Sequence, residues 1–256
     1  MGYIKIQQKE NGIAFLFFNR PEKKNAFNQA LLEELYGALD RLAADAKVRL
    51  LIISGKGDAF SSGVDLKSLL LLKNAKQAKT FARLLENASE KIYRFPHPVI
   101  AVVNGLALGG GFGFATAADI RIVYAGATIG YPAVKLGAIL PASCTVYLQS
   151  LVGRGKAMDL LLTGKMLNGA QAVDYGLGEY LIDDVSELMP FSEQIAGQIL
   201  EGGDEALALT KDTVNFASRL HLEQMKIYAA DNFAYLSQTA DWQERMQAFA
   251  SRKRKK

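Results

Sequence analysis

The chain has 256 residues, of which 50% are hydrophobic, so it is long enough to bury a sizeable core within one large domain. Its formal net charge is +4, but the run Arg252–Lys256 alone carries five basic residues, and the rest of the chain is therefore slightly acidic. A nearly neutral body argues against nucleic-acid binding, and a short basic run is typical of a solvated terminus.

The first predicted elements are a strand, a helix and a second strand. Gly12–Phe18 is rich in β-branched and aromatic residues and runs into a turn at Pro21, which is typical of a strand. Asn28 is expected to cap a helix in which the leucines at positions 31, 35, 39 and 42 share one face. Val48–Ser54 predicts the next strand, and the glycine-containing loop Gly55–Gly63 follows it.

The later elements change from strands to helices. Lys76–Tyr93 predicts a helix, and the apolar run Pro98–Gly105 predicts a strand that is covered on both faces. Ile120–Ala125 predicts a fourth strand, and the chain beyond Ala157 is expected to be largely helical. Early strands and late helices indicate an α/β fold. The last helix has an apolar stripe that packs either on the chain's own core or on another subunit, formed by Trp242, Met246 and Phe249.

Two features bear on the compartment. Cys144 is the only cysteine, which excludes an internal disulfide framework and fits a reducing environment. The N-terminal residues include no apolar run of the kind that forms a signal peptide. We therefore expect a cytoplasmic protein.

The segment Asn104–Ile120 (NGLALGGGFGFATAADI) places five glycines inside an apolar run. A membrane helix is one interpretation, since Val99–Ala118 is long enough to span a bilayer and its glycines have GxxxG spacing. Pro98, Asn104 and the helix-weakening glycines argue against it, and the spacing does not match a phosphate loop. The remaining interpretation is a strand followed by a helix near Gly110, whose first N–H groups point at a substrate as in an oxyanion hole.

An oxyanion hole usually takes its second donor from another segment, and Ala59–Lys67 (AFSSGVDLK) offers a second glycine turn. Several segments together are distinctive: NRPEKKNAFN, FSSGVDL, PVIAVVNGLALGGGFGFATAADIRI, LTGKMLNGAQAVDYGL and ERMQAFASRKRK. In order and spacing they resemble the signature segments of the enoyl-CoA hydratase/isomerase, or crotonase, superfamily over nearly the whole chain. The resemblance implies a crotonase-like spiral of β-β-α units, with an acyl-CoA-binding core at residues 1–190. A helical C-terminal region with a basic tail, residues 191–256, would then assemble the chain into a homotrimer or hexamer.

The same resemblance implies where the substrate binds. The thioester carbonyl oxygen would accept hydrogen bonds from the backbone N–H groups of Val64 and Gly110. Coenzyme A would be part of the substrate, with no permanently bound cofactor and no metal, and Phe249 and Lys253 would reach it from a neighbouring subunit. The full set of implied coenzyme contacts is Lys24, Asn25, Ala26, Asp65, Leu66, Lys67, Phe249 and Lys253.

The chain departs from the family pattern at the acid–base positions. Hydratases of this family use two glutamates, and the matching positions here are Gly113 and Ala133. Isomerase and dehalogenase relatives place a carboxylate further on, at a position that matches Pro141. None of these three residues can transfer a proton.

Few other groups could substitute for the missing glutamates. Glu86 falls where dehalogenase relatives have a histidine, but its spacing from Glu90 favours a solvent-facing helix surface. Tyr131, next to the second empty position, could donate a hydrogen bond or be a buried structural residue. Cys144, where relatives often have glycine, is more typical of a small buried side chain than of a nucleophile. The two histidines, His97 and His221, are expected to be structural.

Three function classes remain open. One is an acyl-CoA enzyme that stabilises a thioester enolate in the hole, by hydration, isomerisation or decarboxylation chemistry. Another is a catalytically weak or inactive acyl-CoA-binding subunit with an assembly or regulatory role. RNA binding through the lysines has the least support, because the body of the chain is nearly neutral.

Overall fold

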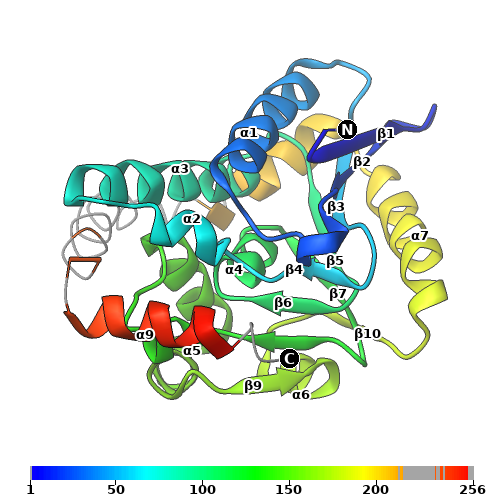
Figure 1. Ribbon diagram of the computed structural model, residues 1–256. Coiled ribbons are helices and arrows are strands. Elements are labelled where there is room, and N and C mark those ends of the chain that lie inside the picture. Colours follow the sequence, from blue (N-terminus) through cyan, green and yellow to red (C-terminus); the bar gives the residue numbers. More distant parts are fainter. Residues whose placement is uncertain (1, 213, 216–233, 235–236, 239, 253–256) are drawn as a thin grey trace.

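The computed structural model describes residues 2–212, 214–215, 234, 237–238 and 240–252 (Figure 1). Two sheets form its centre. The larger sheet has six strands in the order β1 (Ile4–Gln8), β2 (Ile13–Phe18), β3 (Leu50–Gly55), β5 (Val99–Val103), β7 (Ile120–Tyr124) and β10 (Tyr180–Ile182). The smaller sheet has four, in the order β4 (Ala59–Ser61), β6 (Leu106–Leu108), β8 (Thr128–Gly130) and β9 (Met166–Asn168).

The chain alternates between the two sheets in repeated β-β-α units. In each unit the first strand joins the large sheet and the second joins the small one, as β3–β4, β5–β6 and β7–β8 show. Neighbouring units run parallel, whereas β1 and β9 pair antiparallel at the beginning and end of the repeats. The helices that follow the units are α2 (Leu66–Leu70), α3 (Ala75–Tyr93), α4 (Gly110–Thr116) and α5 (Ala142–Thr163). The predicted crotonase-like spiral is confirmed.

The central strands β2, β3 and β5 of the large sheet are buried on both faces, which explains their continuous apolar runs. All six residues of β2 are buried, and they alternate between two hydrophobic clusters. One cluster lies under α1 (Gln29–Ala44), α3, α4 and α5, and the other lies under α7 (Leu188–Leu200) on the opposite side (Figure 1). The expected domain boundary after residue 190 falls inside α7, whose Ile195 and Ala196 belong to the second cluster.

Most predicted boundaries agree with the structure to within a few residues. The Asn28 side chain accepts a hydrogen bond from the Leu31 N–H at 2.8 Å and caps α1, as expected from its position. The expectation that the chain beyond Ala157 is largely helical was incomplete. The strand β9 lies between α5 and α6 (Gly169–Tyr175), and β10 lies between α6 and α7. Each of these strands has only three residues, which is too short to show a period-two pattern in the sequence.

The glycine-rich segment is not a membrane helix. Val99–Ala118 contains two strands and a short helix, β5, β6 and α4. Over the residues that the structure describes, no helix is both long enough and apolar enough to span a bilayer.

The remaining described elements are three 3-10 helices and one helix near the end of the chain. Three short 3-10 helices are η1 (Pro21–Lys23), η2 (Pro132–Leu136) and η3 (Val185–Glu187). The last described helix, α9 (Ala240–Arg252), packs against η2 and α2 of its own chain, and its Met246 is only 1% exposed. Met246 of the predicted apolar stripe therefore packs on the chain's own core. The side chains of Trp242 and Phe249 lie outside the described part of the chain, as do the residues His221 and Lys253.

Candidate active site

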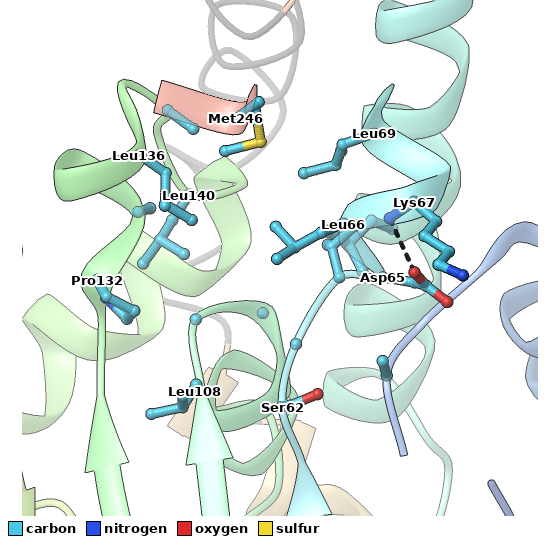
Figure 2. A pocket seen from close by; sticks show the side chains of 18 of the residues that line it. Ser62, Asp65, Leu66, Lys67, Leu69, Leu108, Pro132, Leu136, Leu140 and Met246 are labelled. Atoms are coloured by element: carbon cyan, nitrogen blue, oxygen red, sulfur yellow. Dashed lines mark hydrogen bonds between the residues drawn. The ribbon is translucent and has the colours of Figure 1, made fainter. Parts of the chain in front are cut away.

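A cavity of about 1110 Å³ lies where the loop after β4, the start of α4, α3, η2 and α9 meet. Apolar side chains form most of its wall. Figure 2 shows Leu66 and Leu69 on one side and Leu136 and Leu140 on the other, with Met246 above them. Four exposed lysines also line the cavity and give its solvent-facing rim a basic character: Lys23, Lys24, Lys67 and Lys135.

Two glycine turns meet at the wall of this cavity with their backbones in direct contact. A side chain at Gly63, which has φ +85°, would place its Cβ 2.6 Å from the Leu108 carbonyl oxygen and 3.6 Å from the Gly110 nitrogen. A Cβ at Gly111 would lie 2.3 Å from the Ser61 carbonyl oxygen. Because the two backbones leave no room for a Cβ, both positions require glycine.

Val64 and Gly110, which follow and adjoin this contact, both line the cavity. Val64 forms a parallel bridge with Phe27, in which the Phe27 N–H donates to the Gly63 oxygen at 2.7 Å and the Asp65 N–H donates to the Phe27 oxygen at 2.9 Å. That pattern leaves the N–H of Val64 itself pointing away from the bridge. Gly110 is the first residue of α4, where N–H groups have no partner within the helix. Among the residues that the structure describes, neither N–H donates a hydrogen bond.

The loop before α1 supports these turns through one buried side chain. Asn25 is fully buried and accepts a hydrogen bond from the Arg20 N–H at 2.8 Å. Its Nδ2 donates to the carbonyl oxygens of Lys56 at 3.0 Å and Ala59 at 2.7 Å. Asn25 is therefore closed off from solvent and holds the loops together, and the expectation that it contacts the coenzyme stays a prediction. The neighbouring expected residues Lys24 and Ala26 do line the cavity.

The remaining expected coenzyme contacts lie at the start of α2. Leu66 and Lys67 line the cavity, and Lys67 is exposed. Asp65 caps α2 by accepting a hydrogen bond from the Lys67 N–H at 2.9 Å (Figure 2). Its other oxygen pairs with Arg20 at 2.6 Å, so the Asp65 charge is compensated within the protein.

The empty acid–base positions have different surroundings. Ala133 and Pro141 line the cavity, so a longer side chain at either position could enter it. Position 113 is closed, because a Cβ on Gly113 would lie 2.1 Å from the Cys144 Sγ. Cys144 therefore occupies the space that a glutamate at position 113 would need.

The structure overturns the surface interpretation of Glu86. This residue lines the cavity, is only 5% exposed, and accepts a hydrogen bond from the Ser143 N–H at 2.6 Å. Its expected surface neighbour Glu90 pairs instead with Arg94 at 2.8 Å. The spacing of the two glutamates was misleading, because the buried face of α3 includes the polar residues Glu86 and Ser89 as well as its apolar positions.

The other candidate proton donors are structural. Tyr131 is buried and packs edge-on against Phe112, with ring centroids 5.8 Å apart, and it does not line the cavity. Burial raises the pKa of the Tyr131 hydroxyl, and burial likewise raises the pKa of the Cys144 thiol. Both groups therefore stay protonated at neutral pH. The His97 ring packs against Phe95, and no group of three metal-ligating side chains occurs in the described part of the chain.

Comparisons with known proteins agree with this architecture. A family model described as enoyl-CoA hydratase/isomerase matches residues 8–256. Crotonyl-CoA hydratase of Syntrophomonas wolfei is 36% identical over 250 residues, which cover 97% of this chain and 95% of that relative. An enoyl-CoA hydratase structure from Bacillus anthracis has a TM-score of 0.81 at 31% identity, covering 98% of this chain and 96% of the other. An enoyl-CoA hydratase/isomerase structure from Xanthobacter autotrophicus has a TM-score of 0.90 at 26% identity, covering 98% and 93%. The chain therefore belongs to the enoyl-CoA hydratase/isomerase family.

Proposed function

We propose that this protein is an enzyme that binds acyl-CoA thioesters and stabilises their enolates in an oxyanion hole. The donors are the N–H groups of Val64 and Gly110. The observation that carries the proposal is that the two glycine turns meet at the wall of one cavity, where neither of these N–H groups donates a hydrogen bond to any described residue. An enolate concentrates negative charge on the thioester oxygen, and each well-aimed donor contributes about 3 kcal/mol to its stabilisation.

The cavity suits both ends of such a substrate. The exposed lysines at the rim, among them Lys24 and Lys67, would attract the phosphates of coenzyme A, and the leucine-lined interior would bury the acyl chain. Ala26, Asp65 and Leu66 would line the coenzyme groove between them, and Asn25 would act as a positioning residue. Coenzyme A then belongs to the substrate, and this chemistry needs no permanently bound cofactor.

Several relatives are named as hydratases, but we do not expect this protein to hydrate enoyl-CoA as fast as relatives that have both glutamates. An oxyanion hole cannot itself position water or protonate carbon, and positions 113 and 133 supply no carboxylate. Since loss of an acid–base group typically costs about 10² to 10⁴ in rate, we expect hydration of crotonyl-CoA to be slower than in two-glutamate relatives by roughly 10² or more.

The test is a panel of acyl-CoA thioesters with purified protein, in which binding is measured by calorimetry and products are identified by mass spectrometry. Binding of acyl-CoA, together with slow hydration of short and medium trans-2-enoyl-CoA, is the expected result. Absence of any acyl-CoA binding would contradict the proposal. Hydration at hundreds of turnovers per second would contradict the part that concerns the empty glutamate positions.

A second candidate function is a catalytically weak or inactive acyl-CoA-binding subunit with an assembly or regulatory role. The observation in its favour is that all three usual carboxylate positions are empty: Gly113, Ala133 and Pro141. The same panel separates the two candidates, because a binding subunit would retain acyl-CoA without forming any product.

We also propose that the chain assembles as a homotrimer or a dimer of trimers through its C-terminal region, residues 191–256, and works in the cytoplasm. Light scattering at micromolar concentration tests the assembly, and a stable monomer would refute it. In an assembly, Phe249 and Lys253 are the residues to test for contact with the coenzyme of a neighbouring subunit.

A further inference from the structure

One carboxylate reaches the apolar part of the cavity. Of the three acidic residues that line the described cavity, Glu22 is exposed and Asp65 is paired with Arg20 at the start of α2. The third, Glu86, is buried in α3 and lines the cavity together with Gly110, and the side chain of its neighbour Leu85 lies 3.5 Å from the position of a Cβ on Gly110. Glu86 therefore lines the same cavity as the Gly110 N–H.

The Glu86 carboxylate has a fixed position. One oxygen accepts the N–H of Ser143, the second residue of α5, at 2.6 Å. A carboxylate is favourable there, because the first N–H groups of a helix lack intrahelical partners and form its positive end. The bond holds one carboxylate oxygen at the start of α5, and accepting an N–H does not prevent the carboxyl group from exchanging a proton.

We propose that Glu86 is the catalytic acid–base of this protein, and that it moves a proton between two carbons of an unsaturated acyl thioester. The proposal rests on the oxyanion hole of the proposed function. A single buried carboxylate is enough for a double-bond isomerisation, in which one group first removes a proton and then returns it. Hydration is more demanding, because it also requires a group that holds water.

The step balances without any co-reactant. The Glu86 carboxylate takes the proton from C2 of a 3-enoyl thioester, and the C2–H electron pair moves into the thioester to form a dienolate. The dienolate oxygen accepts hydrogen bonds from the N–H groups of Val64 and Gly110. The Glu86 carboxyl then gives the proton to C4, while the double bond moves from C3–C4 to C2–C3. No atom is gained or lost.

The experiment compares wild-type protein with Glu86→Gln, using 3-hexenoyl-CoA as the substrate and formation of 2-hexenoyl-CoA as the signal. Glutamine keeps an oxygen that can accept the Ser143 N–H, so it preserves the helix contact and removes the exchangeable carboxyl proton. We expect kcat to fall by about 10² to 10⁴, with KM and the urea midpoint of unfolding nearly unchanged. The matched control is Glu90→Gln, four residues further along α3 and absent from the cavity wall, which should keep wild-type kcat.

A kcat within threefold of wild type for Glu86→Gln would overturn the proposal. An isotope measurement on wild-type protein tests it without any variant. With substrate that carries deuterium at C2, a single shielded carboxylate should deliver part of that deuterium to C4 of the product. Product with only solvent hydrogen at C4 would overturn the single-carboxylate step. Wild-type protein that binds the thioester but never forms the 2-enoyl product would also overturn it, whereas failure to bind any acyl-CoA would instead refute the proposed function.

Discussion

The two glycine turns meet at the wall of the cavity that Ala133 and Pro141 also line, but the turns and these two positions are constrained in different ways. The turns are fixed by backbone contacts, because Gly63 and Gly111 each approach a carbonyl oxygen too closely for any side chain. The acid–base positions are fixed by side chains alone, and at Ala133 the fold would accept a different residue without rearrangement of the backbone. If the proposed function holds, the part of the site that stabilises charge is built into the fold, whereas the part that moves protons can be placed on a different element.

The resemblance implies that the three usual carboxylate positions of the family are empty in this chain, and the difference explains how such a chain can keep the family architecture. A change at a turn disturbs the sheet connections as well as the donors, so it affects folding and binding together. A change at a carboxylate position alters the chemistry and leaves the donors in place. Glu86 fits this pattern, because it enters the cavity from α3 rather than from any of the three usual positions.

The strongest way to break the backbone part of the site is Gly63→Ala. The added Cβ would meet the Leu108 oxygen at 2.6 Å in a backbone conformation, φ +85°, that alanine rarely adopts. We expect turnover of any acyl-CoA substrate to fall by about 10² or more, because the Val64 N–H moves with the turn. Steady-state kinetics with the best substrate of the panel checks this prediction. Gly197→Ala in α7, where an added Cβ meets no atom within 4 Å, is the matched control and should keep wild-type turnover.

Asn25→Ala tests whether the loops around the cavity depend on one buried amide. Removing the side chain leaves the Arg20 N–H and the Lys56 and Ala59 oxygens without their hydrogen bonds. We expect the free energy of unfolding to fall by about 2 to 4 kcal/mol, and acyl-CoA affinity to fall with it. Asn74→Ala removes the single cap of α3 and should cost only about 1 kcal/mol. If urea unfolding shows the same loss of unfolding free energy in both variants, Asn25 contributes no more than a single helix cap does.

The pair Gly113 and Cys144 tests why the first glutamate position is closed. A Cβ at Gly113 would lie 2.1 Å from the Cys144 Sγ, so Gly113→Ala should destabilise the protein by about 1 to 3 kcal/mol. The substitution Cys144→Gly removes that contact, and the double variant should recover about 1 kcal/mol or more relative to the sum of the single effects. Strict additivity in urea unfolding would contradict the clash. A glutamate at position 113 should for the same reason be tolerated only together with a smaller residue at position 144.

The sequence predicted the fold and the close approach of the two glycine turns, because backbone requirements are visible in a single sequence, whereas the donor roles of Val64 and Gly110 stay a prediction. Glycine clusters at strand ends indicate close backbone approach, long apolar strands indicate burial on both faces, and Gly63 and Gly110 were predicted in this way. The sequence could not tell which glycines are sterically required. Gly110 itself would accept a Cβ at ordinary contact distance from Leu85, whereas its neighbour Gly111 would not.

Side-chain roles were harder to predict, because they depend on contacts between distant segments. Glu86 and Ser143 are 57 residues apart, and no local pattern indicates that one accepts the N–H of the other. The burial of Asn25 could not be predicted either, because three charged residues, EKK, directly precede it in the sequence. A signal that could have identified Glu86 is its position on α3, between the buried residues Leu85 and Ser89, which places it outside a regular polar face.

The smallest expected effect concerns the basic rim, where contacts to the substrate are exposed and screened by solvent. Lys67 lines the cavity from the first turn of α2, and its side chain is solvent-exposed. Because an exposed charge contact contributes little, Lys67→Gln should raise KM for acyl-CoA only about two- to fivefold and leave kcat unchanged. The difference should shrink as salt is added, since ions screen an exposed charge from the coenzyme phosphates. Lys73→Gln, a change at an exposed lysine that does not line the cavity, is the control for general surface charge. If both variants raise KM equally, the rim attracts the coenzyme through overall charge. If Lys67→Gln lowers kcat as well, Lys67 also influences the position of the thioester in the hole.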